Sequence, residues 1–277
     1  MESFFSFLEK RVDDCSSLLC VGLDPHVSEL PKPTAAAALD FCLHLVEQTA
    51  PYAAAFKPNA AFFEVFGSRG WSALKKLIHT ISTSSYNRGS RIPVILDAKR
   101  GDIASTAEAY AESAFKKLGA NAITLNPYLG KDSIDPFLRD QERGVFLLCK
   151  TSNSGASDLQ DLLVSPVGAT HASPLHEHVA RLAQTWNTKN NIGLVVGATQ
   201  PEALTRIRAI VPKMWFLVPG VGAQGGDLET ALMAGLRKDG KGMLINISRG
   251  ISQAKNPALA AAEFRDTIAH IMLSFHK

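Results

Sequence analysis

The sequence repeats one pattern eight times: a short apolar run bounded by turn residues, followed by a longer stretch whose apolar residues have helical spacing. The pattern predicts strands over residues 18–24, 53–57, 93–99, 122–126, 145–150, 192–197, 214–219 and 243–248. It predicts helices over residues 34–49, 71–83, 103–118, 133–143, 176–188, 201–211, 228–238 and 257–275. Strands that alternate with helices pair in parallel, because a parallel pair needs a crossover connection.

Eight strand-helix units favour an α/β fold that closes into a (β/α)₈ TIM barrel. Runs such as LLCVGL, FLLC and GLVVG are apolar nearly throughout, which is typical of strands buried on both faces. A length of 277 residues fits one such barrel, and no linker divides the chain. We therefore expect a single (β/α)₈-barrel domain over residues 1–277, with an active site at the carboxyl ends of its strands.

Composition excludes several classes of function. The net charge is only +3 and the Lys and Arg residues are scattered, which argues against a nucleic-acid partner. No run approaches the roughly 18 apolar residues of a membrane span, and the start, MESFFSFLEKRVDD, indicates a short helix rather than a signal peptide. Cys15, Cys20, Cys42 and Cys149 show no CxxC spacing, so we expect buried free thiols and a reducing compartment.

Charged residues gather where the predicted strands end. Asp97 and Lys99 are two apart on one strand and therefore point into the same space, and Asp102 follows at the turn. A lysine held between two carboxylates stays protonated and is a positioned proton donor. Asp24 and Lys57 end two other strands, and such a convergent set of charges indicates a catalytic site more than a structural ion-pair network. Other polar residues at strand ends are Asn126, Thr151, Ser152, Asn246, Ser248 and Arg249.

The segment PGVGAQGGD matches the pattern G-x-G-x-x-G but follows the seventh strand, not the first as a dinucleotide-binding fold requires. Loops seven and eight of barrels commonly bind phosphate through glycine N–H groups. We therefore expect the glycines of this loop, such as Gly222 and Gly225, on the phosphate side of a substrate, with Arg249 adding a bidentate contact.

Taken together, these motifs resemble the orotidine 5′-phosphate decarboxylase family over nearly the whole chain. LDAKRGDIAST resembles the family signature D-x-K-x-x-D-I, and CVGLDP, FKPN, KTSNSG, PGVGAQGGD and ISRG follow in the expected order. The resemblance implies metal-free decarboxylation of orotidine 5′-monophosphate to UMP in pyrimidine biosynthesis, with no cofactor. It is strongest to the longer-chain branch found in some bacteria and in the fused UMP synthases of protists.

The resemblance also implies a role for each matched residue. Lys57, Asp97, Lys99 and Asp102 form the charge network, and Lys99 protonates C6. The implied substrate-binding residues are Asp24, Ile103, Thr106, Asn126, Ser152, Gly222, Gln224, Gly225 and Arg249. Asp24 and Lys57 match ribose-contacting positions, and Ser152 matches the serine that reads the pyrimidine, with Thr151 and Asn153 as alternatives.

The resemblance implies a homodimer with shared active sites, because Asp102, Ile103 and Thr106 match residues that reach into the partner's site. It leaves open a fused orotate phosphoribosyltransferase domain in the full-length protein. A cytoplasmic location is expected unless such a domain carries an organellar signal.

Four alternatives remain at this stage. A related sugar-phosphate decarboxylase or epimerase shares D-x-K-x-x-D, although Lys57 stands where its metal-ligating acid is expected. A non-catalytic phosphate-binding barrel would not need Lys99 between two aspartates. A nicotinamide oxidoreductase is weakened by the position of the glycine motif. The histidines of THASPLHEH lack a supporting ligand pattern, so we expect no metal site there.

Overall fold

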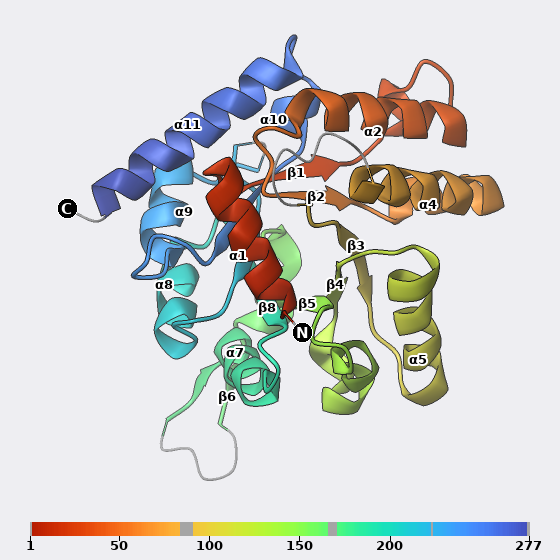
Figure 1. Cartoon of the computed structure of the whole chain (residues 1–277). Coiled ribbons are helices and arrows are strands. Elements are labelled where there is room, and N and C mark those ends of the chain that lie inside the picture. Colours follow the sequence, from red (N-terminus) through yellow and green to blue (C-terminus); the bar gives the residue numbers. More distant parts are fainter. Residues whose placement is uncertain (1, 84–90, 166–170, 223, 276–277) are drawn as a thin grey trace.

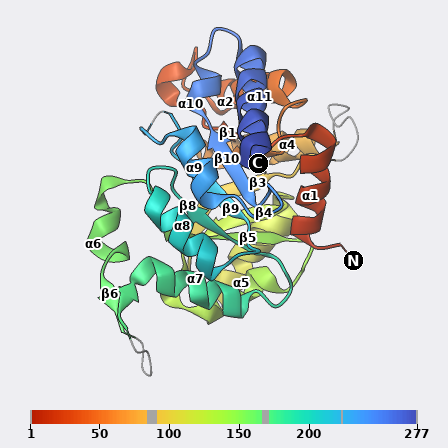
Figure 2. The ribbon, with the colours of Figure 1, turned by 90° about the vertical axis from the view of Figure 1, so that its left-hand side faces the viewer.

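Eight parallel strands form a barrel surrounded by helices (Figures 1 and 2). This computed structural model describes residues 2–83, 91–165, 171–222 and 224–275. The barrel strands are β1 (Leu19–Leu23), β2 (Ala55–Pro58), β3 (Ile95–Arg100), β4 (Ala122–Leu125), β5 (Gly144–Lys150), β8 (Ile192–Val196), β9 (Phe216–Pro219) and β10 (Met243–Ile247). Their order is β2-β1-β10-β9-β8-β5-β4-β3, and parallel bridges from Phe56 to Val94 and from Asn59 to Asp97 join β2 to β3. The predicted (β/α)₈ barrel is confirmed.

Every predicted strand is present to within a few residues. All residues of β1, β2, β4, β8 and β10 are buried, because the barrel interior lies on one side of each strand and the helices lie on the other. The buried apolar side chains form one continuous core of strand and helix residues.

The helices that cover the barrel begin at local sequence signals. Thr34 accepts a hydrogen bond from the Ala37 N–H at the start of α2, and Asp227 accepts one from Thr230 at the start of α9. The helices are α1 (Phe4–Cys15), α2 (Ala35–Thr49), α3 (Ala61–Glu64), α4 (Gly67–Thr83), α5 (Ala104–Glu112), α6 (Ser157–Gln160), α7 (Leu175–Trp186), α8 (Pro201–Ile210), α9 (Leu228–Gly235), α10 (Arg249–Ser252) and α11 (Pro257–Phe275). A π-helical turn, η2 (Ser113–Lys117), extends α5.

The predicted helix over residues 133–143 is wrong. The connection from β4 to β5 contains three 3₁₀ turns, η3 (Pro127–Leu129), η4 (Lys131–Ser133) and η5 (Asp135–Leu138), and none of its described residues is α-helical. Pro136 lacks an N–H group and disfavours helical backbone at the preceding residue, so the apolar spacing there does not become an α-helix.

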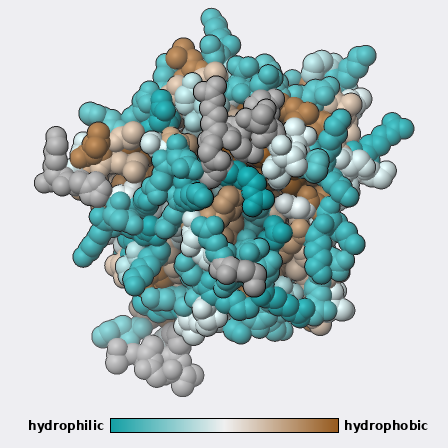
Figure 3. Space-filling view, in the orientation of Figure 1, coloured by the Kyte–Doolittle hydropathy of each residue, from teal (hydrophilic) through white to brown (hydrophobic). Residues whose placement is uncertain are grey.

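The helix α1 closes the end of the barrel where the strands begin (Figure 1). Phe4 and Phe5 pack edge-on against Phe146 at the start of β5, and the buried Arg11 guanidinium donates to the carbonyls of Ala50 and Ala53. The face that carries α1 is mostly hydrophilic, with hydrophobic residues in small separate groups (Figure 3). A pocket opens at the opposite end, at the carboxyl ends of the strands.

The connection from β5 to α7 is longer than the others and adds α6 and a short antiparallel pair, β6 (Leu163–Val164) with β7 (Ser173–Pro174). It projects from the side of the barrel (Figure 2).

All four cysteines are free and buried, as predicted. Among the described residues, no helix has the length and apolar character that a membrane crossing needs.

Candidate functional site

A pocket of about 710 Å³ lies at the carboxyl ends of the strands, where the barrel is open. Seven of the predicted site residues line it: Asp24, Lys57, Asp97, Lys99, Ser152, Gln224 and Arg249. They come from strands or loops on all sides of the barrel, so the closed sheet brings together residues that are far apart in the sequence.

A chain of charges crosses one wall of this pocket. The Asp97 carboxylate accepts a hydrogen bond from Lys57 Nζ at 2.8 Å on Oδ2 and from Lys99 Nζ at 2.6 Å on Oδ1. The side chains of Lys57 and Asp97 are 5% and 11% exposed, whereas that of Lys99 is 51% exposed. Lys99 is therefore the more accessible of the two cations.

These ion pairs determine the charge state of the buried members. Burial alone would lower the pKa of Lys57, but the carboxylates of Asp97 and Asp24 raise it above its ordinary value. Burial likewise opposes ionisation of Asp97, but Lys57 and Lys99 hold the pKa of this carboxyl well below its usual range. Lys57 and Asp97 are therefore both charged at neutral pH.

The pH dependence of stability should report the Asp97 ion pairs. Because the pKa of Asp97 is lower in the folded chain than in the unfolded chain, its charge stabilises the fold above about pH 4, and this contribution is lost as the pH falls further. We expect Asp97→Asn to lower the free energy of unfolding by about 3–5 kcal/mol near neutral pH, since the buried Lys57 loses the carboxylate to which it donates. Urea unfolding between pH 7 and pH 2 should show this difference shrinking as the solution is acidified; a constant difference would contradict it.

The backbone at Lys99 has an unusual conformation. Its φ is +48°, a left-handed value that costs a residue with a Cβ atom about 1–2 kcal/mol. The β3–β4 register shifts at this point: Leu96 faces Ile123, but Arg100 faces Leu125. Four residues of β3 therefore advance against two of β4, and the bulge carries Asp97 and Lys99. The sequence predicted that these two side chains share a space, but it did not predict the bulge.

The residues after β3 do not enter this pocket. Asp102 Oδ1 accepts a hydrogen bond from the N–H of Ile103 at 2.8 Å. Among the described residues, Lys99 pairs with Asp97 and not with Asp102 of the same chain. The expectation that Lys99 is flanked by Asp102 of its own chain is therefore wrong. Ile103 is 53% exposed and Thr106 is exposed on the first turn of α5, so this segment faces outwards.

Two buried polar atoms of the pocket have no partner among the described residues. Asp24 Oδ1 and Asn246 Oδ1 are both buried without a hydrogen bond, and both residues line the pocket. Unpaired buried oxygens are costly, which marks these atoms as acceptors for a polar ligand.

The loop after β9 and the start of α10 form the opposite wall. Gln224, Arg249 and Gly250 line the pocket there. Gly222 and Gly225 have φ values of +69° and +84°, which explains why glycine is needed. Their N–H groups donate to the carbonyls of Gly226 and Gly222 inside the loop, so these two glycines shape the wall without lining it.

The segment after β5 is fixed by a hydrogen-bond network. Gln160 accepts from the Thr151 N–H and donates to Thr151 Oγ1, both at 2.8 Å, and Thr151 Oγ1 donates to Asn153 Oδ1 at 2.6 Å. Nearby, the buried Lys150 ammonium donates to both oxygens of Asp161 at 2.8 Å. The Thr151 hydroxyl thus donates its one hydrogen to Asn153 and accepts from Gln160, whereas the Ser152 hydroxyl, which also lines the pocket, takes no part in this network.

Several predicted site residues do not line the pocket, and the sequence analysis missed others that do. Asn126 does not line the pocket; its side chain accepts from the Tyr128 N–H and caps a 3₁₀ turn. Pocket residues that the sequence analysis did not single out include His26, Asn59, Phe62, Thr124 and Gln160. Thr124 is a lone polar residue in an apolar strand, a signal that could have been noticed, but Gln160 lies in the insertion and carries no such signal.

The histidine segment supplies packing and hydrogen bonding. Burial lowers the pKa of His176, whose Nδ1 lies 2.9 Å from the Gln160 carbonyl and 3.3 Å from Asp161. Within residues 2–83, 91–165, 171–222 and 224–275, no group of three or more His, Cys, Asp or Glu residues is placed to hold a metal.

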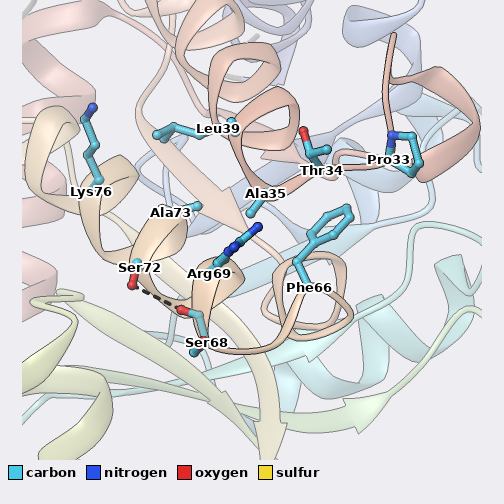
Figure 4. A pocket seen from close by; sticks show the side chains of 11 residues that line it. Pro33, Thr34, Ala35, Leu39, Phe66, Ser68, Arg69, Ser72, Ala73 and Lys76 are labelled. Carbon is cyan, nitrogen blue, oxygen red and sulfur yellow. Dashed lines mark hydrogen bonds between the residues drawn. The ribbon is translucent and has the colours of Figure 1, made fainter.

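A second hollow, of about 740 Å³, lies outside the barrel between α2 and α4 (Figure 4). Apolar side chains such as Leu39, Phe66 and Ala73 form much of its wall, and Arg69 and Lys76 are its charged residues. It holds no carboxylate and is not at a strand end, so the two hollows differ in chemistry and we assign the site to the first.

The fold and the pocket define a (β/α)₈-barrel enzyme with a lysine–aspartate ion pair at the open end of the barrel. The sequence profile of the orotidine 5′-phosphate decarboxylase / HUMPS family matches residues 17–264, and the chain belongs to this family. A relative from Roseiflexus castenholzii named orotidine 5′-phosphate decarboxylase is 46% identical over 267 residues, covering 95% of this chain and 93% of the relative.

Two solved structures are similar to this chain in both sequence and fold. The structure of Leishmania donovani OMP decarboxylase is 52% identical, with a TM-score of 0.86, and the match covers 98% of this chain and 99% of that one. The structure of Leishmania donovani UMP synthase is 54% identical, with a TM-score of 0.88, and the match covers 98% of this chain and 56% of that longer chain.

Proposed function

We propose that this chain decarboxylates orotidine 5′-monophosphate to UMP in pyrimidine biosynthesis. The observation that carries the proposal is the half-exposed Lys99 ammonium, held at 2.6 Å by a buried carboxylate in the open end of the barrel. The family and the names of the relatives in both comparisons support the same reaction.

The substrate fits the pocket in one direction. Its phosphate lies against Arg249 and Gln224, because among the described residues of the pocket Lys57 and Lys99 are paired with Asp97 and Arg249 forms no ion pair. The ribose lies near Asp24 and Lys57, where the unpaired Asp24 oxygen accepts a hydroxyl. The pyrimidine edge then reaches Ser152, whose hydroxyl is not used by the network around Thr151.

The proposed reaction replaces a carboxylate with a proton. The bond between C6 and the carboxyl carbon breaks, CO₂ leaves, and the electron pair remains on C6. The Lys99 ammonium then donates a proton to C6, forms the new C–H bond, and regains its proton from solvent. Asp97 holds the Lys99 ammonium in place and repels the substrate carboxylate, which raises the energy of the bound substrate more than that of the transition state.

Proton donation alone is too weak for this reaction. General acid catalysis contributes about 10²–10⁴-fold, whereas an electron pair on an sp² carbon is not delocalised into the ring and the barrier is high. The preorganised Lys99 cation and the binding energy of the phosphate supply the remaining stabilisation.

A related sugar-phosphate decarboxylase or epimerase is the second candidate, because such enzymes share the D-x-K-x-x-D pattern of Asp97, Lys99 and Asp102. The pairing of Lys57 with Asp97 argues against it, since a buried cation occupies the place where a metal-ligating acid is expected. Neither a cofactor nor a metal is required by the proposed chemistry.

Ultraviolet absorbance of orotidine 5′-monophosphate mixed with the purified chain in EDTA tests the proposed function. Conversion to UMP at enzymatic rates supports it. No conversion, with activity on a sugar phosphate after addition of Mg²⁺, would replace it with the second candidate.

We also propose a homodimer with shared sites. Exposed apolar side chains follow three neighbouring strands at the open end of the barrel: Val65 after β2, Ile103 after β3, and Tyr128 and Leu129 after β4. A cluster of this kind is typical of a subunit interface. It would place Asp102 of one subunit beside the site of the other, which accounts for the lack of an ion pair between Asp102 and Lys99 of the same described chain.

Mixing two inactive variants tests this arrangement. In a shared-site dimer of Lys99→Ala with Asp102→Asn, one of the two sites has both wild-type residues. Random exchange of subunits should therefore restore about a quarter of the wild-type activity, since half of the dimers are mixed. Each variant alone is the control. No recovery after exchange, verified by mass spectrometry of the mixed dimer, would place Asp102 in the site of its own chain.

Three broader features remain proposals. We propose that residues 1–277 act as one domain, which the continuous core supports. Fusion to an orotate phosphoribosyltransferase domain is supported by the match to a UMP synthase of which this chain spans 56%. A cytoplasmic location is supported by the four free thiols.

A further inference from the structure

Thr124 lies in the middle of β4 and is 1% exposed, yet its hydroxyl touches both members of the Lys99–Asp97 ion pair. Thr124 Oγ1 accepts from the backbone N–H groups of Ala98 at 3.0 Å and Lys99 at 2.9 Å. It donates to Asp97 Oδ1, also at 3.0 Å.

We infer that Thr124 is a positioning residue of the decarboxylation site, because its hydroxyl holds the backbone of Lys99 and the carboxylate of Asp97 in one fixed arrangement. This inference rests on the proposed function and adds to it a residue that does not itself react with the substrate.

The hydroxyl is fully committed to this task. A threonine hydroxyl has one hydrogen to donate and two lone pairs that accept. Two backbone N–H groups occupy the lone pairs, so the hydrogen must point to Asp97. Lys99 Nζ donates to the same carboxylate oxygen, and Lys57 donates to the other. The carboxylate therefore has one orientation.

The bulge in β3 explains why a side chain is needed here. Between the pairs Leu96–Ile123 and Arg100–Leu125 the ladder of hydrogen bonds is interrupted, and the N–H groups of Ala98 and Lys99 have no β4 carbonyl in register. Thr124 Oγ1 takes the place of those carbonyls. It thereby holds Lys99 at φ +48°, a conformation that the chain would otherwise leave.

Thr124 is itself rigid. Its backbone faces Phe146 in the regular β4–β5 pairing, and a β-branched side chain has few rotamers. A group held on a strand positions its neighbours more accurately than one on a loop. Loss of the hydroxyl should therefore displace the Lys99 ammonium without removing any group that contacts the substrate.

The test compares Thr124→Val with Thr124→Ser. Valine keeps the size and branching but removes the hydroxyl; serine keeps the hydroxyl. For Thr124→Val we expect kcat to fall roughly 10²-fold while KM changes less than about threefold, because misplacement affects the chemical step. Thr124→Ser should retain kcat within about threefold of wild type.

Thr49→Val is the matched control. Thr49 is also fully buried and donates to the Leu45 carbonyl at 2.7 Å, but it lies on α2 outside the pocket. The Thr49→Val variant should be less stable than the wild type but should have the same kcat per folded molecule. If Thr124 were only structural, Thr124→Val would behave in the same way, and that result would overturn the inference.

If Thr124→Val does not fold, a second pair of variants, Thr124→Cys and Thr124→Ser, tests the same inference. Thr124→Cys and Thr124→Ser have similar sizes, but a thiol is a weak donor and acceptor. We expect kcat of the cysteine variant to fall at least about tenfold below that of the serine variant. Equal kcat values would overturn the inference while leaving the proposed reaction intact. An inactive wild type would instead overturn the reaction, and with it this role for Thr124.

Discussion

Lys99→Ala is expected to lower kcat for orotidine 5′-monophosphate by at least about 10³-fold, because the variant loses both the proton donor and the preorganised cation. The affinity for UMP should change far less, since UMP has no charge at C6 for Lys99 to stabilise. Steady-state kinetics together with calorimetric titration of UMP separate the two effects.

Lys131→Ala is the control for this substitution. Lys131 is 55% exposed and pairs with Asp135, so it matches Lys99 in exposure and in partner type but lies outside the pocket. Its removal should leave kcat unchanged. Turnover by Lys99→Ala within about tenfold of the wild type would be too small a loss for a proton donor and would exclude that role.

Arg249→Ala is expected to lower kcat/KM for orotidine 5′-monophosphate by about 10²–10⁴-fold, the loss of two charge-assisted hydrogen bonds to a phosphate. The effect should depend on the phosphate itself. Turnover of orotidine, the nucleoside without phosphate, should be nearly equal in the wild type and the variant.

Arg69→Ala provides the comparison, because Arg69 is an exposed arginine on α4 that lines the hollow outside the barrel. It should leave both substrates unaffected. An equal loss on orotidine and on its phosphate in Arg249→Ala would show that Arg249 acts elsewhere than on the phosphate.

The sequence was sufficient to predict the barrel because each strand is a short apolar run with a turn at both ends. It was also sufficient to bring Asp24, Lys57, Asp97 and Lys99 together, since all four end predicted strands and the carboxyl ends of barrel strands meet. No knowledge of side-chain contacts was needed for this step.

Contacts that depend on local backbone geometry could not be predicted. The bulge that holds Lys99 at a positive φ is absent from the alternation of apolar and polar residues, and the role of Thr124 depends on that bulge. The expected contact between Lys99 and Asp102 of the same chain was also wrong, because two residues three apart across a glycine turn need not face each other.

The helix predicted over residues 133–143 shows a third kind of error. Its apolar residues are buried, as Phe137 is, but burial was achieved by 3₁₀ turns around Pro136 and not by an α-helix. Periodicity indicated which side chains are buried and overestimated the regularity of the backbone.

The most direct test of the central claim is proton NMR of the product formed from orotidine 5′-monophosphate in D₂O with EDTA. The ammonium of Lys99 exchanges its protons for deuterons in this solvent, so the wild-type chain should yield UMP with deuterium at C6, and Lys99→Ala should yield almost none. Unchanged substrate with the wild type, or UMP formed equally well by Lys99→Ala, would contradict the account.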